Sequence, residues 1–349
     1  METFWYVAVA LMLAIYVLLD GFDFGVGIVY PLVAPTESDR RTALAAIGPI
    51  WTANEVWLIA AGGVLFFAFP KVYAAGFSGF YLALILVLWL LIGRGLALEL
   101  RSHLDHPVWW RFWDLVFMGT STLLAVVFGA ALGNLIRGVP LNQDGFFFVA
   151  LWTDLMTGPD PGILDWFTIL MGVASGAILA LHGANYLAMK TAGDLQRRAR
   201  SVSWHAGLAA AGLVLAALIA LPFVQPLFHT NYAAHPIGYL FPVAGLASLA
   251  TSIVCGRRER DAAAFLSSGL FILAMLGSTA WGSYPHLLIA TTDPAYSLTI
   301  SNAATDAYGL ETGLWWFLIG FGLLIVYQVT AHLAFRGKVR LDEACSADR

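Results

Sequence analysis

Five ionisable side chains lie within long apolar stretches of the sequence, where charged groups are rare. They are Asp20, Asp23, Glu55, Arg94 and Glu99. An ionised group in hydrocarbon costs several kcal/mol, so a charge that is kept there usually has a function or a partner. Carboxyl groups can take up and release protons, and an arginine can bind a carboxylate through two parallel hydrogen bonds. Two roles fit: a path for protons or ions from the cytoplasm, or an ion-pair network that only holds helices in register.

Asp20 and Asp23 form the pair whose spacing is most informative. Residues three apart share one face of a helix, and Gly21, Gly25 and Gly27 surround this pair. Small residues allow a neighbouring helix to come close. Because four acidic groups accompany one arginine, carboxylates are in excess, and we expect at least one of them to hold a proton at neutral pH. A proton relay requires such a group.

The elements that must position these side chains are membrane-spanning helices. Apolar residues make up 60% of the chain and charged residues 11%, and the mean hydropathy is +0.77. Soluble domains carry roughly 25% charged residues, so this composition excludes an ordinary soluble protein. Alternating barrel strands are absent, which favours helical spans of about 20 residues each. We predict an all-α polytopic protein in which residues 1–349 form a single integral membrane domain.

Nine spans are predicted, at about 4–30, 49–69, 77–100, 112–136, 164–188, 204–224, 237–255, 262–283 and 312–335. The first span has no basic residue before it and no cleavage site after it. We therefore expect it to be retained, and not removed as a signal peptide.

The basic residues alternate from loop to loop and predict the orientation. Fifteen of the 18 Lys and Arg follow odd-numbered spans, whereas the other loops hold only Lys71 and Arg137, and Arg94 lies inside a span. Short cytoplasmic loops collect Lys and Arg, so the amino terminus is expected outside and the carboxyl terminus in the cytoplasm. Cys255 and Cys345 then face the cytoplasm as reduced thiols. The five intramembrane charges all fall in the cytoplasmic half of the first three spans.

The histidines do not form a convincing haem or metal site. His182 and His332 lie in spans and are potential axial ligands, but their expected depths match poorly. We interpret both as hydrogen-bonded residues of helix packing. His103 and His106 flank Asp105 in a predicted cytoplasmic loop, where solvent exposure is expected and not metal binding.

Trp51 and Trp57 flank Asn54 and Glu55 on the second span. Trp commonly lies at membrane interfaces, but helical spacing points Trp57 to the same face as Asn54. Each Trp is therefore either an interface anchor or the wall of a site. Nucleotide-binding and hydrolase motifs are absent from the sequence, and no nucleic-acid partner is expected.

Segments distributed over the whole chain together resemble subunit II of the cytochrome bd quinol oxidases. Each is short, but their combination and order are specific to that family. They are DGFDFGVG at 20–27, WTANEVWL at 51–58, YAAGFSGFY at 73–81, Arg94 with ELR at 99–101, GNL at 133–135 with GVP at 138–140, GANYLAMKT at 183–191, and YSLTI at 296–300 with Asn302 and Ala303.

The resemblance implies two four-helix bundles plus one peripheral helix, in the bacterial cytoplasmic membrane. It implies a haem-free core subunit, not catalytic alone, of a terminal oxidase that couples quinol oxidation to reduction of oxygen to water. Its partner would be subunit I, which carries haems b and d; a small single-span accessory subunit and a structural quinone would accompany some members. By position, Asp23, Glu55, Arg94 and Glu99 would belong to a polar network for proton uptake, and Trp57 would lie near the oxygen-access route.

Thr52 departs from the pattern of the family. Some members have an acidic residue directly after the Trp of the second span, where this chain has Thr52. Glu55 stands where some relatives have Gln, and our hypothesis is that it supplies a carboxylate by another route.

Two other classes of protein share some of these features. A proton-coupled secondary transporter would also carry buried charges, but it should have broken helices around a site at the membrane centre. A haem-binding cytochrome in its own right would need better axial ligands than His182 and His332.

Overall fold

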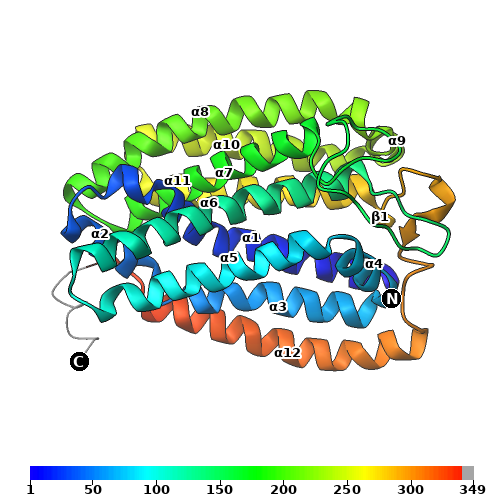
Figure 1. Cartoon of the computed structure of the whole chain (residues 1–349), viewed down its shortest axis with the longest axis horizontal. Helices are drawn as coiled ribbons and strands as arrows, with labels where there is room; N and C mark the ends of the chain where they lie inside the picture. The colour runs from blue at the N-terminus through cyan, green and yellow to red at the C-terminus, as the bar shows by residue number, and fades with distance from the viewer. Residues whose placement is uncertain (340–349) are drawn as a thin grey trace.

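Nine long apolar helices dominate the computed structural model, which describes residues 1–339 (Figure 1). Cys345 therefore lies outside the described residues. Within that range the number of spans is as predicted from the sequence. The spans are α1 (Glu2–Val33), α3 (Trp51–Ala68), α5 (Tyr81–Leu100), α6 (Pro107–Arg137), α7 (Trp166–Lys190), α8 (Gly193–Val224), α10 (Leu240–Arg257), α11 (Asp261–Ser283) and α12 (Ala307–Ala334).

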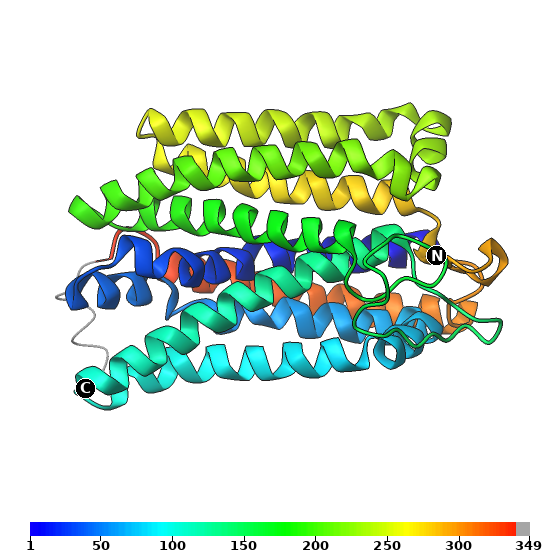
Figure 2. The same ribbon diagram turned by 45° about the horizontal axis from the view of Figure 1, so that its top comes forward.

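The helices form two four-helix bundles that share a face, plus one helix on the outside. Helices α1, α3, α5 and α6 make the first bundle, and α7, α8, α10 and α11 make the second. Figure 2 shows the second bundle, coloured green to yellow, lying above the first, coloured blue to cyan. Helix α1 packs against α7 and α11 of the second bundle as well as against its own neighbours. Helix α12 lies against α3 at the periphery (Figure 1).

Several short elements connect the spans and were not predicted from the sequence. The sequence TESD, residues 36–39, begins α2 with a capping box in which Thr36 and Asp39 exchange hydrogen bonds. The short elements are α2 (Glu37–Ile47), α4 (Pro70–Gly79), η1 (Arg101–His103), α9 (Pro226–Ala234), η2 (Pro236–Tyr239), β1 (His286–Leu288), η3 (Pro294–Tyr296) and β2 (Leu298–Thr299). Strands β1 and β2 pair in antiparallel orientation. A β-bridge between Val139 and Ala290 joins the loop that follows α6 to the loop that follows α11.

Helix α8 extends well beyond the predicted sixth span. The sixth span was expected to begin near residue 204, but α8 begins at Gly193, where the backbone has a positive φ of 68°. The first turns of α8 carry Arg197, Arg198 and Arg200. Hydropathy excludes such residues from a span, although a helix can continue beyond the hydrocarbon into the headgroup region.

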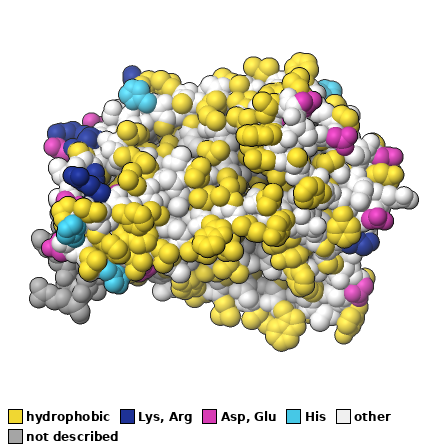
Figure 3. All heavy atoms as spheres, viewed as in Figure 1, with side chains coloured by type: hydrophobic (Ala, Val, Ile, Leu, Met, Phe, Trp, Pro, Cys, Tyr) yellow, Lys and Arg dark blue, Asp and Glu magenta, His cyan; other side chains and the backbone are white. Residues whose placement is uncertain are grey.

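Charge divides the two ends of the molecule. Figure 3 shows Lys and Arg gathered at one end, Asp and Glu predominant at the other, and hydrophobic side chains between them. We call these the basic end and the acidic end. Helix α1 begins at the acidic end, and α12 finishes at the basic end (Figure 1). This separation is the pattern expected of a protein whose basic end lies in the cytoplasm, and the orientation itself stays a prediction.

Helices α1 and α7 are in backbone contact at two glycines. A Cβ atom added to Gly25 would overlap the carbonyl group of Leu179, and one added to Gly183 would overlap the backbone of Gly25. The first bundle therefore meets the second through a contact that admits no side chain on either helix.

We predict that Gly25→Ala destabilises the protein by about 1–3 kcal/mol, because the added methyl group meets backbone that cannot move aside. The midpoint of thermal unfolding in detergent would measure the change. Gly212→Ala in α8 is the control, since nothing lies within 4 Å of its added Cβ. Equal midpoints for the Gly25→Ala protein and the wild type would contradict the close contact.

Candidate functional site

A buried ion pair lies at the centre of the first bundle. Nη1 of Arg94 on α5 donates to Oδ1 of Asp20 on α1 at 2.7 Å, and neither side chain has exposed surface. Two aromatic rings complete the pocket of the guanidinium: its Cζ lies 4.5 Å from the ring centre of Phe24 and 5.8 Å from that of Trp51. The sequence predicted that Arg94 would pair with one of the acids, and the structure identifies Asp20 as that acid.

A chain of polar side chains leads away from this pair to the peripheral helix. Nδ2 of Asn54 on α3 donates to Oδ2 of Asp23 at 2.9 Å. Nε2 of Gln328 on α12 donates to Oδ1 of Asn54 at 2.9 Å, while Nε1 of Trp57 donates to Oε1 of Gln328 at 3.2 Å. We call the set Asp20, Asp23, Asn54, Arg94 and Gln328 the inner network. It joins four helices at one depth.

Sequence reasoning missed Gln328 and placed no weight on α12. Only 6% of the residues in the most apolar 18-residue stretch of α12 are buried within the chain. Gln328 is nevertheless buried. A single polar residue facing inward from an otherwise exposed helix was the available signal. One turn further along, Nδ1 of His332 lies 3.0 Å from the carbonyl oxygen of Gln328, so the polar chain extends towards the basic end.

The structure brings Glu55 close to the inner network but leaves Glu99 outside it. Glu55 is half-buried on α3, one residue after Asn54. Glu99 is exposed on α5, and among residues 1–339 it makes no ion pair. The expectation that Glu99 joins the network was wrong, because residues 94 and 99 lie on different faces of the helix: the side chain of Arg94 turns inward and that of Glu99 turns outward.

Several buried polar atoms of the inner network have no hydrogen-bond partner among the described residues. They are Nε and Nη2 of Arg94, Oδ2 of Asp20 and Oδ1 of Asp23. Buried polar groups are nearly always satisfied by protein or ordered water. The site is therefore suited to hold water between its carboxyl groups, and such a hydrated array can transfer protons.

A second charged cluster lies at the basic end and was not predicted. Asp114 on α6 accepts hydrogen bonds from Tyr30 at 2.6 Å, from Arg101 at 2.6 Å and from Arg40 at 2.8 Å. Arg101 also donates twice to Glu37 of α2. Burial opposes ionisation of Glu37, but hydrogen bonds from Arg101 and from the neighbouring arginine on α2 outweigh it and lower the pKa of this carboxyl group. Every acid here is paired, so the cluster serves to fix α2 on the bundle.

His182 occupies the hydrogen-bonded packing position expected of it, and His103 and His106 are exposed, as expected. His182 is fully buried, with Nδ1 2.7 Å from the hydroxyl of Ser268 and Nε2 3.0 Å from the carbonyl oxygen of Leu18. Its ring nitrogens are thus both engaged. Nδ1 of His103 lies against the Glu99 carbonyl, and His106 caps the start of α6. Within residues 1–339 no group of His, Cys, Asp and Glu is arranged to hold a metal.

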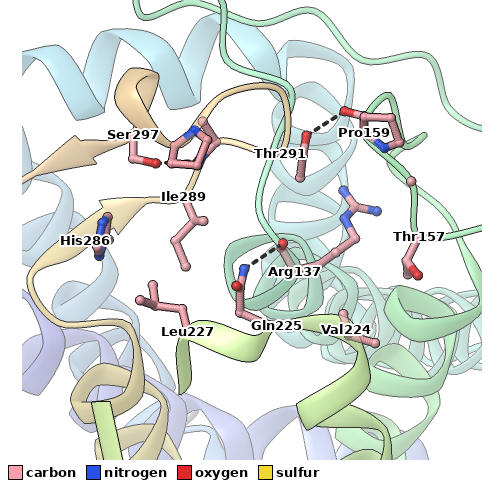
Figure 4. Close-up of a pocket in the computed structure, with 13 residues that line it drawn as sticks. Arg137, Thr157, Pro159, Val224, Gln225, Leu227, His286, Ile289, Thr291 and Ser297 are labelled. Atoms are coloured by element: carbon pink, nitrogen blue, oxygen red, sulfur yellow. Dashed lines mark hydrogen bonds between the residues drawn. The ribbon is translucent and has the colours of Figure 1, made fainter. Parts of the chain in front are cut away.

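A pocket of about 480 Å³ opens at the acidic end, between the end of α6, the α8–α9 junction and β1 (Figure 4). Gln225 donates to the carbonyl oxygen of Arg137 at 3.0 Å, and Thr291 donates to that of Pro159 at 2.7 Å. The guanidinium of Arg137 pairs with Asp165. By contrast, Nδ1 of His286 in the same pocket is buried without a partner among the described residues.

An apolar cavity between the two bundles lies next to this pocket. Its wall includes Leu221 and also Ile136 and Phe228, whose chain neighbours Arg137 and Leu227 line the pocket itself. Residues of α1, α6, α7, α8 and α11 form the rest of the wall. A polar opening thus adjoins an apolar interior, an arrangement suited to a molecule with a polar ring and an apolar tail.

Comparison with known proteins agrees with the resemblance seen in the sequence. A family model described as cytochrome bd terminal oxidase subunit II matches residues 1–335. The probable cytochrome oxidase subunit 2 of Haemophilus influenzae is 31% identical, over 96% of this chain and 94% of its own length. Cytochrome bd ubiquinol oxidase subunit 2 of Bacillus subtilis is 30% identical, over 96% of each protein.

A solved structure shows the same fold at lower identity. A chain of the bd oxidase from Geobacillus thermodenitrificans aligns with a TM-score of 0.71 at 20% identity. The alignment covers 96% of this chain and 98% of that one. The nine-helix arrangement is therefore shared between the two proteins.

We predict that Asp20→Asn destabilises the protein by about 3–5 kcal/mol, because it leaves the Arg94 guanidinium buried without a countercharge. The double variant with Arg94→Gln should lose less stability than the sum of the two single changes. Unfolding in detergent measures both. Asp194→Asn is the matched control: its carboxylate pairs with Arg197 at an exposed site, so the change should cost about 0.5 kcal/mol or less. Strict additivity of the two inner substitutions would refute the pair as a structural unit.

Proposed function

Because the chain belongs to the family of cytochrome bd terminal oxidase subunit II, we propose that its inner network takes up protons from the basic end for the reduction of oxygen. The chain is a core subunit of a bd-type terminal oxidase and part of a quinol oxidase complex. The observation that carries the proposal is the hydrogen-bonded series from Asp23 through Asn54 to Gln328, beside the Asp20–Arg94 pair.

The two aspartates of the inner network have different roles in this proposal. Arg94 donates to Asp20 at 2.7 Å and compensates its negative charge. Asp23 has only the neutral amide of Asn54 as its partner, and its Oδ1 is unpaired among the described residues. Asp23 is therefore the carboxyl group available to bind a proton and pass it on through water. Arginine keeps its proton, so Arg94 organises the site and does not relay.

Glu55 is the proposed link between Asp23 and the surface. Thr52 is exposed on α3, and Glu55 follows three residues later on the same side of the helix, one turn deeper. The position that is acidic in some relatives thus carries no carboxyl group here, but an adjacent position does. This placement supports Glu55 as the substitute carboxylate.

Trp57 and Trp51 are the proposed walls of an oxygen-access route, together with Asn54. Trp57 is 1% exposed and packs edge-on against Phe321 of α12 at 5.8 Å. Trp51 is half-buried at the start of α3. Oxygen is small and apolar, so it partitions into aromatic surroundings such as the contact of Trp57 with Phe321.

The partner is proposed to be subunit I, which would carry haems b and d and the quinol-oxidising site. The support from this chain is its exposed apolar surface, which includes Ile59 on α3, Trp89 on α5 and Leu323 on α12. Part of such a surface can be covered by a second polytopic chain and part by lipid. A small single-span accessory subunit would occupy a further strip, and the complex would lie in the bacterial cytoplasmic membrane.

A structural quinone is proposed for the pocket at the acidic end and the adjoining apolar cavity. Burial lowers the pKa of His286, so its imidazole is neutral at pH 7 and can donate one N–H to a ring carbonyl. The wall formed by Ile136, Leu221 and Phe228 would contact the isoprenoid tail. A quinone held in this way would supply a redox-active ring, and the residues of this chain would position that ring.

We predict that Asp23→Asn and Glu55→Gln each slow quinol-driven oxygen reduction by about tenfold or more, because a proton-transferring group is lost. An oxygen electrode measures turnover, and haem absorbance confirms that the complex is assembled. Glu99→Gln makes the same chemical change at an exposed position and should leave turnover unchanged. Full turnover in assembled Asp23→Asn and Glu55→Gln complexes would exclude the proposed path.

We predict that His286→Ala lowers the amount of quinone that co-purifies with the complex by several-fold, because the ring loses its hydrogen-bond donor. Extraction followed by chromatography measures quinone per haem. His229→Ala, an exposed change at the same end, should have no effect. Retention of quinone in the His286→Ala complex would place the quinone elsewhere.

A further inference from the structure

A basic groove lies between α8 and α10 at the basic end, in the second bundle and away from the inner network. Its volume is about 320 Å³. Arg197, Arg200, Ser201 and Trp204 line it from α8, and Arg257 lines it from the end of α10. None of these residues takes part in the proton path or in the quinone pocket proposed above.

Arg257 has an unusual environment for an arginine of this protein. Its guanidinium Cζ lies 3.5 Å from the ring centre of Trp204, which is a stacked cation–π contact. Among residues 1–339 it makes no ion pair, whereas Arg200 pairs with Glu259 and Asp261 and Arg197 pairs with Asp194. Stacking fixes the plane of the guanidinium and leaves its N–H groups available at the edge. This is the geometry with which arginine binds phosphate through two parallel hydrogen bonds.

The surface next to the groove is apolar in the direction of the membrane centre. Leu208 on α8 is 49% exposed and Val254 on α10 is 46% exposed. Further along α8, Leu215 is 50% exposed. The groove is therefore at the level where a Trp side chain commonly marks the lipid–water interface, with charges on the water side and aliphatic side chains on the lipid side.

We propose that this groove binds the phosphate headgroup of an anionic phospholipid. Arg257 donates to the phosphate oxygens from its position on Trp204, and Arg197 and Ser201 approach from the opposite wall. The acyl chains lie along the exposed apolar side chains of α8 and α10. Arg197 and Arg200 are paired with acidic side chains, so the uncompensated positive charge of the groove is that of Arg257. This charge favours a lipid with net negative charge over a zwitterionic one.

Lipid binding to the purified oxidase complex tests the proposal. Native mass spectrometry would count phosphatidylglycerol and phosphatidylcholine retained by the complex from mixed micelles of the two lipids. We expect the wild type to prefer phosphatidylglycerol, and Arg257→Gln to weaken the binding of that lipid about tenfold, as for the loss of a charge-assisted hydrogen-bonded pair. Trp204→Leu should weaken it less, because it removes the support of Arg257 and keeps the charge.

Arg258→Gln is the matched control, since Arg258 is the next residue, is exposed and does not line the groove. Unchanged lipid binding in Arg257→Gln would overturn the proposal, and so would an equal loss in Arg258→Gln. A further arm uses radiolabelled inorganic phosphate. Retention of phosphate by the wild type but not by Arg257→Gln, with no difference in lipid, would assign the groove to free phosphate and would likewise overturn the proposal.

Discussion

The buried pair of Arg94 and Asp20 is the interaction on which the first bundle depends. Neither side chain is exposed, so each charge is isolated from solvent by the surrounding helices. Removing two ions from water costs several kcal/mol for each, and the pair offsets that cost only while its geometry is kept. Helices α1 and α5 are consequently tied in one relative rotation. The same rotation presents Asp23 to Asn54 and hence to α12.

Helix α1 uses two sides for two kinds of contact, one with its own bundle and one with the second bundle. One side carries Asp20 and Asp23 towards α5 and α3. The other side carries Gly25, whose lack of a side chain admits the backbone of α7 at Gly183. Any shift of α1 that relieved one contact would disrupt the other, because the helix is rigid over this length. The position of the inner network within the first bundle follows from this double constraint.

The cluster at Asp114 and the inner network differ in how completely their polar groups are paired. At the basic end, Asp114 accepts from three donors and Arg101 binds two acids, so charge there stabilises structure. In the inner network, several donors and acceptors have no partner among the described residues. A carboxylate whose oxygens are all hydrogen-bonded to cations is held in its ionised form. A carboxyl group with a free oxygen can bind a proton and release it. This difference is the physical reason for proposing a function for the network and a structural role for the cluster at Asp114.

The sequence by itself predicted the number of spanning helices that residues 1–339 contain, and it assigned the intramembrane charges to the first three of them. These properties depend on hydropathy and on loop charge, which are local and additive along the chain. It also determined that Asp20 and Asp23 share a face, because helical periodicity fixes this without reference to any neighbour. The start of α8 was missed because its first turns are charged and leave the hydrocarbon.

Only the tertiary structure decided which side chains meet. Glu99 and Arg94 lie on one span at similar depth, yet only Arg94 turns inward. Gln328, from the far end of the chain, completes the network, and Trp204 fixes Arg257 across two helices. Such contacts depend on the rotation of each helix about its axis, which packing against several neighbours sets together. The local sequence indicates the position of a residue along a helix and the face on which it lies, but it does not determine the rotation of that helix towards its neighbours.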